Sequence, residues 1–262
     1  MTLGFKSSDI FGVKVTPTTM DDLFTLMDRS IAAEDKVVIA SLNLHGMYKL
    51  FKDDVFRALH EDDKTCVHID GMPIIWLGRA AGLDLDASHR TGWVDWFLPL
   101  MERAQRSGWR IYYLGGTSRV LADGLARLRR DYPDLAIDGH DGYFDARRGS
   151  AGNTAVVEHI NAFRPHLLIV GMGMGRQEHW ISENRADLKT NCIGTCGACM
   201  EYFAGAVPTA PRWLGPLGLE WLYRLISDPK RFWHRYLVEP WFVAWFLITG
   251  AGRRRAPART DR

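Results

Sequence analysis

An acidic residue at position 70 stands where a general base would be expected. Asp70 directly follows the short apolar run Thr65–Ile69 and precedes Gly71, which leaves the backbone free to turn. A carboxylate at the end of a strand can approach a substrate hydroxyl group and remove its proton. The same position also suits a helix N-cap or a turn-forming aspartate, so both interpretations stay open at this point.

Two glycine-rich segments indicate where a diphosphate could approach the backbone. Their residues are Gly115, Gly116 and Thr117 in the first, and Gly171, Gly173, Gly175, Arg176, Gln177 and Glu178 in the second. Backbone amides in such segments, and at the start of a following helix, can bind phosphate oxygens. The second segment reads GxGxG rather than the GxGxxG of dinucleotide-binding proteins, and no strand-end acidic residue follows about 20 positions later. A nicotinamide-dependent oxidoreductase stays open as an alternative use of this segment.

The C-terminal segment combines arginines with aromatic residues. Arg224, Arg231 and Arg235 are spaced by seven and four residues, so all three can lie on one helical face if the break at Asp228-Pro229 is small. Guanidinium groups bind phosphate oxygens bidentately, so these arginines could bind a diphosphate. The simpler interpretation is that they form a charged helical face exposed to solvent. Five tryptophans between positions 213 and 245 favour an interfacial segment, whose aromatic side chains enter the headgroup region of a membrane while the arginines bind phosphates.

Two further groups could hold a metal ion, and neither has the expected pattern. Cys192, Cys196 and Cys199 lack a nearby fourth ligand and a second CxxC pair, so we expect them to be buried in the core. Asp84 and Asp86 form the only DxD sequence in the chain, and we expect them in a surface turn. The sequence therefore predicts a protein that uses neither a bound metal ion nor another cofactor.

The candidate residues follow segments that have the composition of buried strands. The expected strands are Lys36–Leu42, Thr65–Ile69, Trp109–Leu114, His166–Val170 and Asn191–Thr195. Helical stretches alternate with these strands, which predicts an α/β protein with a Rossmann-like parallel sheet and helices on both of its faces. The carboxyl ends of parallel strands meet along one edge of the sheet, where ligands bind. We therefore expect Asn43, Asp70 and both glycine-rich segments to belong to one site.

The composition, 47% apolar and 24% charged, is that of a globular protein, and its charge divides the 262 residues into two parts. Residues 211–262 contain ten Lys and Arg against four Asp and Glu, a net charge of +6, whereas residues 1–210 carry −4. We expect 1–210 to form an α/β catalytic core and 211–262, which ends with the basic run Arg253-Arg254-Arg255 and a few further residues, to form a helical, membrane-associating appendage. The acidic core argues against nucleic acid as a partner. The absence of a membrane-spanning apolar run and of a visible signal peptide predicts a cytoplasmic location.

A set of short motifs stands in a definite order between about residues 10 and 240. They are Ser41-Leu42-Asn43, Asp70-Gly71, His89-Arg90-Thr91-Gly92, Leu114-Gly115-Gly116, Asp141-Gly142-Tyr143-Phe144, Arg164-Pro165, the run 171–178, the run 218–225, and Pro229-Lys230-Arg231. No single motif is specific, but the ordered set resembles the WecG/TagA/CpsF family, glycosyltransferase family 26. The resemblance implies a metal-independent, inverting transfer of a sugar from a UDP-sugar to a polyprenyl-diphosphate-linked sugar at the cytoplasmic face of the bacterial inner membrane.

The resemblance also implies roles for individual residues. They are Asp70 as the base, with Asn43 and Ser41 beside it; Gln177 and Glu178 in the donor pocket; and Arg224 and Arg231, with Arg235 or His234 as a third cation, on the diphosphate. The implied partners are the UDP-sugar donor, the polyprenyl-diphosphate-linked acceptor and an anionic membrane surface. The oligomeric state stays open, with a homo-oligomer as one outcome.

Three departures from the pattern of the family concern the donor sugar. Gly175 stands where relatives usually have proline, Glu201 stands where they have aspartate, and the aspartate that usually follows the Arg90-Thr91-Gly92 segment is displaced to Asp95. We therefore expect the glucosyl branch of the family, which serves xanthan-type exopolysaccharide assembly. The alternatives are a transferase of N-acetylmannosamine or N-acetylmannosaminuronic acid, and a non-catalytic, membrane-associated scaffold.

Overall fold

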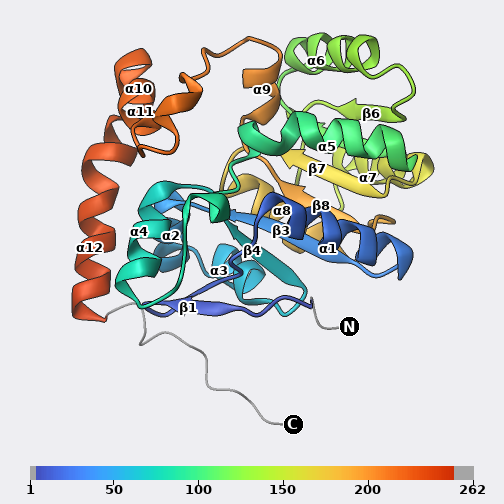
Figure 1. Ribbon diagram of the computed structural model, residues 1–262. Coiled ribbons are helices and arrows are strands. Elements are labelled where there is room, and N and C mark those ends of the chain that lie inside the picture. Colours follow the sequence, from blue (N-terminus) through green and yellow to red (C-terminus); the bar gives the residue numbers. More distant parts are fainter. Residues whose placement is uncertain (1–3, 251–262) are drawn as a thin grey trace.

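Six parallel strands form the central sheet, as seen in a computed structural model that describes residues 4–250 (Figure 1). In their order across the sheet, the strands are β4 (Thr65–Ile69), β3 (Val37–Leu42), β8 (Cys192–Thr195), β7 (Leu167–Gly171), β5 (Ile111–Gly115) and β6 (Ile137–His140). Every neighbouring pair is parallel, so all six carboxyl ends lie along one edge. A separate antiparallel hairpin of β1 (Ser8–Ile10) and β2 (Val13–Val15) packs beside β4.

Helices cover both faces of this sheet, which confirms the expected α/β architecture. They are α1 (Met20–Ala32), α2 (Leu44–Lys52), α3 (Asp54–Glu61), α4 (Met72–Ala80), the short η1 (Ala87–His89), α5 (Trp93–Ser107), α6 (Ser118–Asp131), α7 (Ala151–Phe163), α8 (Arg176–Asn184) and α9 (Cys199–Phe203). Successive residues of β3 point to opposite faces. Val37 and Ile39 join the apolar cluster under α1, α5 and α6, whereas Val38 and Ala40 join the cluster under α3, α7 and α8.

The five expected strands agree with the observed ones to within two residues at each end. Their runs are apolar because strands of a parallel sheet are buried on both faces. Two elements were missed, β6 and the hairpin of β1 and β2. β6 has the sequence IDGH with a single apolar residue, and each hairpin strand has three residues, so neither produces a detectable apolar run.

The appendage (residues 211–262) is helical over its described part and packs along one side of the core. It contains the short η2 (Arg212–Leu214), α10 (Glu220–Ser227), α11 (Pro229–Trp233), the π-helical turn η3 (His234–Val238) and α12 (Glu239–Thr249). The expected break is confirmed, because α10 ends before Asp228, whose side chain caps α11 by accepting from the Arg231 amide (3.2 Å). α12 lies along α2, where Phe246 stacks on Phe51 with 4.6 Å between ring centroids (Figure 1).

Within residues 4–250, every helix is too short or too polar to cross a bilayer. The basic run Arg253-Arg254-Arg255 lies outside the described residues. The expected division of the chain at residue 210 stays a prediction.

Candidate active site

The side chains of Asn43 and Asp70 meet at the ends of two neighbouring strands, β3 and β4. Asn43 caps α2 with its Oδ1, which accepts from the Gly46 amide (3.1 Å), and its Nδ2 donates to Asp70 Oδ2 (3.3 Å). The helix that follows β4, α4, has Gly71 at its N-cap, and its first amides donate to no capping side chain. The helix-cap interpretation of Asp70 is therefore wrong, and its carboxylate is directed to the site.

The surroundings of Asp70 raise its pKa to about 6, from an ordinary value of 3.8. Burial of the carboxyl group has the largest effect, and the carboxylate of Glu220 acts in the same direction. Arg224, Asn43 and Arg90 act in the opposite direction. A carboxyl group with this pKa is ionised at neutral pH and is a stronger base than an ordinary aspartate. It is therefore suited to remove a proton from a hydroxyl group.

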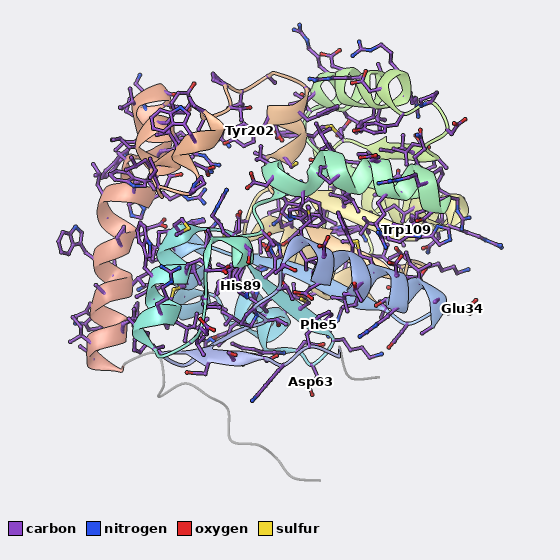
Figure 2. All side chains as sticks on the ribbon, in the orientation of Figure 1. Phe5, Glu34, Asp63, His89, Trp109 and Tyr202 are labelled. Atoms are coloured by element: carbon purple, nitrogen blue, oxygen red, sulfur yellow. The ribbon has the colours of Figure 1, made fainter. Side chains whose placement is uncertain are left out.

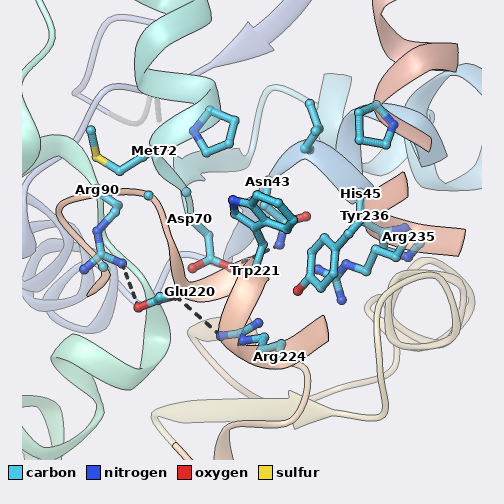
Figure 3. Close-up of a pocket in the computed structure, with 16 residues that line it drawn as sticks. Asn43, His45, Asp70, Met72, Arg90, Glu220, Trp221, Arg224, Arg235 and Tyr236 are labelled. Carbon is cyan, nitrogen blue, oxygen red and sulfur yellow. Dashed lines mark hydrogen bonds and ion pairs between the residues drawn. The ribbon is translucent and has the colours of Figure 1, made fainter. Parts of the chain in front are cut away.

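Two cavities meet at this carboxylate. The larger cavity, of about 340 Å³, lies between the start of α4 and the appendage, and Figure 3 shows the residues that line it. The smaller cavity, of about 190 Å³, lies at the ends of β7 and β8. The residues that line both cavities are Asn43, His45, Asp70, Arg224 and Arg235. Two molecules, one in each cavity, would therefore meet beside the same carboxylate.

The loop after β7 is fixed to the loop after β8 by Gln177 and Glu178. Gln177 lines the smaller cavity, and its Oε1 accepts from the Gly197 amide (3.1 Å) while its Nε2 donates to Glu178 Oε1 (2.8 Å). Glu178 is fully buried, and its Oε2 accepts from the Gly175 amide (2.5 Å). Burial raises the pKa of Glu178 to about 7. Gln177 thus faces the cavity, whereas Glu178 lies behind it and holds the loop.

The three arginines of the appendage converge on the same two cavities. Arg224 and Arg235 line both cavities and Arg231 lines the smaller one, whereas His234 lines neither. Each guanidinium group lies over an aromatic ring, and that of Arg224 lies 5.3 Å from the ring centroid of Tyr202. Figure 2 shows Tyr202 on the side of the core that faces α10. Cations arranged around a half-buried cavity are suited to bind a diphosphate.

Comparison of the sequence with known proteins identifies a family. A model of the glycosyl transferase WecG/TagA/CpsF family matches residues 8–257. The chain belongs to this family. It is 30% identical over 175 residues to the N-acetylglucosaminyldiphosphoundecaprenol N-acetyl-beta-D-mannosaminyltransferase of Bacillus spizizenii, an alignment that covers 66% of this chain and 65% of that protein. The protein of the same name from Staphylococcus aureus strain MW2 is 30% identical over 144 residues, or 55% of each chain.

These alignments span between about half and two thirds of the length of the relatives. The family resemblance expected from the ordered motifs is thereby confirmed. The names of the two relatives describe transfer of N-acetylmannosamine rather than of glucose.

The glycines that were expected to let a diphosphate approach the backbone have two different surroundings. Gly173 lines the smaller cavity, whereas Gly115, Gly116 and Gly171 line neither cavity. A Cβ atom on Gly115 would lie 2.2 Å from the carbonyl oxygen of Gly171, and one on Gly171 would lie 2.1 Å from the hydroxyl oxygen of Tyr113. Gly115 and Gly171 therefore let β5, β7 and their loops pack closely together. This packing lies outside the two cavities and holds the loops that line the smaller one.

Ser41 lines the smaller cavity, but its hydroxyl group is occupied by other parts of the core. Its Oγ donates to the Thr195 carbonyl (2.9 Å), accepts from Trp93 Nε1 (3.1 Å) and lies 2.9 Å from His68 Nε2. Burial lowers the pKa of His68 to about 3, so this cluster is uncharged. Ser41 therefore joins the ends of β3 and β8 beneath Asn43.

Sequence reasoning missed several residues of the larger cavity. They are His45, Arg90, Glu220, Trp221, Tyr236 and Pro240, of which Arg90, Glu220 and Trp221 stand within the ordered motifs without a role of their own. Glu220 lies between two cations, with Oε1 3.7 Å from Arg90 NH1 and Oε2 3.6 Å from Arg224 NH2 (Figure 3). Arg90 also pairs with the displaced Asp95 (2.8 Å). This chain of charges joins the appendage to the core across the cavity.

The structure shows the surroundings of the cysteines and aspartates that have the residue types of metal ligands. Cys192, Cys196 and Cys199 are buried, as expected, and burial raises the pKa of Cys196 to about 12. Cys196 and Cys199 nevertheless line the smaller cavity, which the sequence did not indicate. Asp84 and Asp86 are both exposed, as expected, in the surface loop before η1, which Asp86 caps.

Proposed function

We propose that the protein is a glycosyltransferase that moves a sugar from a UDP-sugar to a polyprenyl-diphosphate-linked sugar. The observation that supports this most directly is the position of Asp70 at the junction of two cavities, because transfer requires both substrates to meet at one base. Membership in the family supports the same class of reaction. We assign the donor to the smaller cavity and the acceptor to the larger one, which opens toward the appendage.

In the proposed reaction, Asp70 takes the proton of the acceptor hydroxyl group while that oxygen attacks the anomeric carbon of the donor sugar. The bond from this carbon to the diphosphate oxygen breaks, its electron pair leaves with UDP, and the configuration at the carbon inverts. Arg224, Arg231 and Arg235 bind the diphosphate of the donor, which is negatively charged both before and after the bond breaks. With these cations supplied by the chain, we expect transfer to proceed in the presence of EDTA and without an added metal ion.

The names of the relatives favour N-acetylmannosamine as the transferred sugar and N-acetylglucosamine as the first sugar of the acceptor lipid. We therefore propose this pair ahead of the glucosyl transfer expected from the sequence. Glucose is kept as the second donor because of Gly175. Its φ of 95° lies outside the range that proline can adopt, so the loop over the donor cavity has a different backbone from a proline-containing loop.

We further propose that the appendage rests on the cytoplasmic face of the bacterial inner membrane as a peripheral contact. Large apolar side chains are exposed along its described part: Trp213, Leu217, Leu219, Trp221, Leu222, Ile226, Trp233, Leu237, Trp241, Phe242, Trp245 and Ile248. An exposed apolar surface of this extent is typical of a docking surface. Tryptophans beside arginines fit the interface of an anionic membrane, where the diphosphate of a lipid acceptor also lies.

The deciding experiment is a transfer assay with a panel of donors and acceptors. UDP-N-acetylmannosamine, UDP-N-acetylmannosaminuronic acid and UDP-glucose would each be offered with lipid-diphosphate-linked N-acetylglucosamine or glucose, and products detected by mass. We expect transfer from UDP-N-acetylmannosamine to the N-acetylglucosamine lipid, with the Asp70→Asn protein as the matched blank. Absence of transfer from every donor, together with saturable binding of a nicotinamide dinucleotide, would favour the oxidoreductase alternative instead.

A further inference from the structure

His45, at the start of α2, lies on the boundary between the two cavities. It lines both of them, beside Arg224 and Arg235 (Figure 3). The sequence offered no reason to select it, because a single histidine after a strand is unremarkable on its own. Its surroundings in the structure show which of its two ring nitrogens a ligand can reach.

A carboxylate from α12 determines the orientation of the His45 ring. Glu239 is buried, and its Oε2 lies 2.6 Å from His45 Nδ1, while its Oε1 lies 3.3 Å from Nδ1 of His234. An ionised carboxylate only accepts hydrogen bonds, so His45 Nδ1 carries a proton and donates it to Glu239. Among the described residues, His45 Nε2 has no hydrogen-bond partner. Nε2 is therefore the nitrogen left for a ligand in the cavities.

The charges around the ring favour its neutral form at neutral pH. Burial lowers the pKa of His45, and the cations Arg235 and Lys49 act in the same direction, whereas Glu239 opposes them. His234 lies on the other side of Glu239 and shares its carboxylate. A diphosphate at the cavity boundary would bring negative charge to Nε2 and favour the imidazolium form. Proton uptake changes Nε2 from an acceptor into a donor for a phosphate oxygen.

We propose that His45 binds the diphosphate of a substrate through Nε2, that it takes up one proton as the diphosphate arrives, and that Glu239 is its positioning residue. The inference rests on the proposed function in one respect, namely that the ligand carries a diphosphate. UDP and the lipid acceptor share this group, and the boundary position of His45 allows either to supply it. Glu239 also belongs to α12, so the appendage contributes to the site through this carboxylate as well as through its arginines.

The test is the pH dependence of binding, measured by calorimetry between pH 6 and 8. UDP is the probe in one arm, and a short-chain polyprenyl diphosphate in detergent is the probe in the other. Binding that takes up one proton strengthens as pH falls, by up to about tenfold per unit. Protonation of the phosphate itself contributes equally to every variant, so the quantity compared is the slope of the wild type minus that of His45→Gln.

We expect His45→Gln to bind the relevant probe about tenfold or more weakly at pH 6.5 and to lose most of the extra slope. Glu239→Gln keeps an acceptor for His45 Nδ1 but removes the negative charge that favours the imidazolium form. The pH dependence of binding should therefore persist in this variant but occur at lower pH. His179→Asn is the matched control, because His179 pairs with Asp53 at 2.7 Å and lines neither cavity. The probe that shows the slope identifies which substrate contacts His45.

Several outcomes would overturn the inference. If His45→Gln retained the wild-type slope for both probes, His45 would not be the group that takes up the proton. If the wild type and His45→Gln, each measured in two buffers of different ionisation enthalpy, took up the same number of protons on binding, the inference would also fail. A wild type that bound neither probe and transferred no sugar would instead reject the proposed function.

Discussion

The core side and the appendage side of the candidate site are built by different means. On the core side, Asp70 and Gln177 are held by hydrogen bonds to residues that follow neighbouring parallel strands. On the appendage side, Arg224, Arg231 and Arg235 stand on short helical segments and lie over aromatic rings. Proton transfer depends strictly on distance and angle, whereas the attraction between charges falls off slowly with distance. We therefore expect core substitutions to reduce kcat and appendage substitutions to raise KM.

The largest effect is expected for Asp70→Asn. The amide cannot accept the proton of the acceptor hydroxyl group, so kcat should fall by about 10²–10⁴-fold. Asparagine has nearly the same size, so the thermal unfolding temperature and the affinity for UDP should stay close to those of the wild type. Steady-state kinetics beside calorimetry would measure both. Turnover close to that of the wild type would remove Asp70 from the mechanism.

Arg224→Gln should produce the opposite pattern, with a raised KM and a smaller change in kcat. Arg224 lines both cavities and can neutralise a diphosphate in either, and hydrogen bonds to a charged group contribute enough to predict a rise in KM of about 10–100-fold. Arg119→Gln is the matched control, because the Arg119 side chain is 92% exposed on α6. A fall in kcat at unchanged KM would place Arg224 with the core residues and break the comparison.

The pH dependence of kcat should follow the ionisation of Asp70. Its pKa of about 6 in the folded protein means that the active carboxylate is lost as pH falls through this value. We expect kcat, measured with both substrates saturating, to fall about tenfold per unit below pH 6 and to level off above pH 7. The same profile should be absent from the residual activity of Asp70→Asn. An unchanged kcat between pH 5 and 7 would contradict the assignment.

The smallest effect on chemistry is expected from the exposed aromatic side chains of α12. Trp241 is 77% exposed, so Trp241→Ala should change the free energy of unfolding by no more than about 0.5 kcal/mol. Co-sedimentation with anionic vesicles should weaken by about three- to tenfold, because apolar surface that enters the interface is lost. Activity on a detergent-solubilised acceptor should be unchanged. Arg231→Glu should show the reverse, with transfer reduced more than vesicle binding.

Much of the fold could be predicted because buried parallel strands leave a direct mark on the sequence. Each of the five expected strands is an apolar run, and the rule that ligands bind at strand ends correctly predicts that Asn43 and Asp70 lie together. Family motifs pointed to Gln177 and Glu178, but a motif does not distinguish a side chain that faces a cavity from one that supports it. Only the structure shows that Glu178 is buried behind Gln177.

The residues that could not be predicted depend on contacts between distant parts of the chain. His45 and Glu239 are 194 positions apart, and their pairing follows from the way α12 packs on α2. The ion pairs of Glu220 with Arg90 and Arg224 likewise require the appendage to be placed over the core. Local spacing carries no information on such packing, so these charges appeared only as separate residues in the sequence.

The helix α2 connects the reacting group to the outer side of the molecule. Asn43 caps one end of it, and Phe51, near the other end, packs on Phe246 of α12. With nine residues, α2 is about 13 Å long. If α12 rests on a bilayer as proposed, α2 fixes the distance between the membrane and the Asp70 carboxylate. The carboxylate then stays at a constant depth in the headgroup layer. The position of the acceptor's reacting hydroxyl group would then depend on its distance from the diphosphate and not on the length of the lipid. A lipid with only a few isoprene units would therefore present the same reacting end as the full-length carrier.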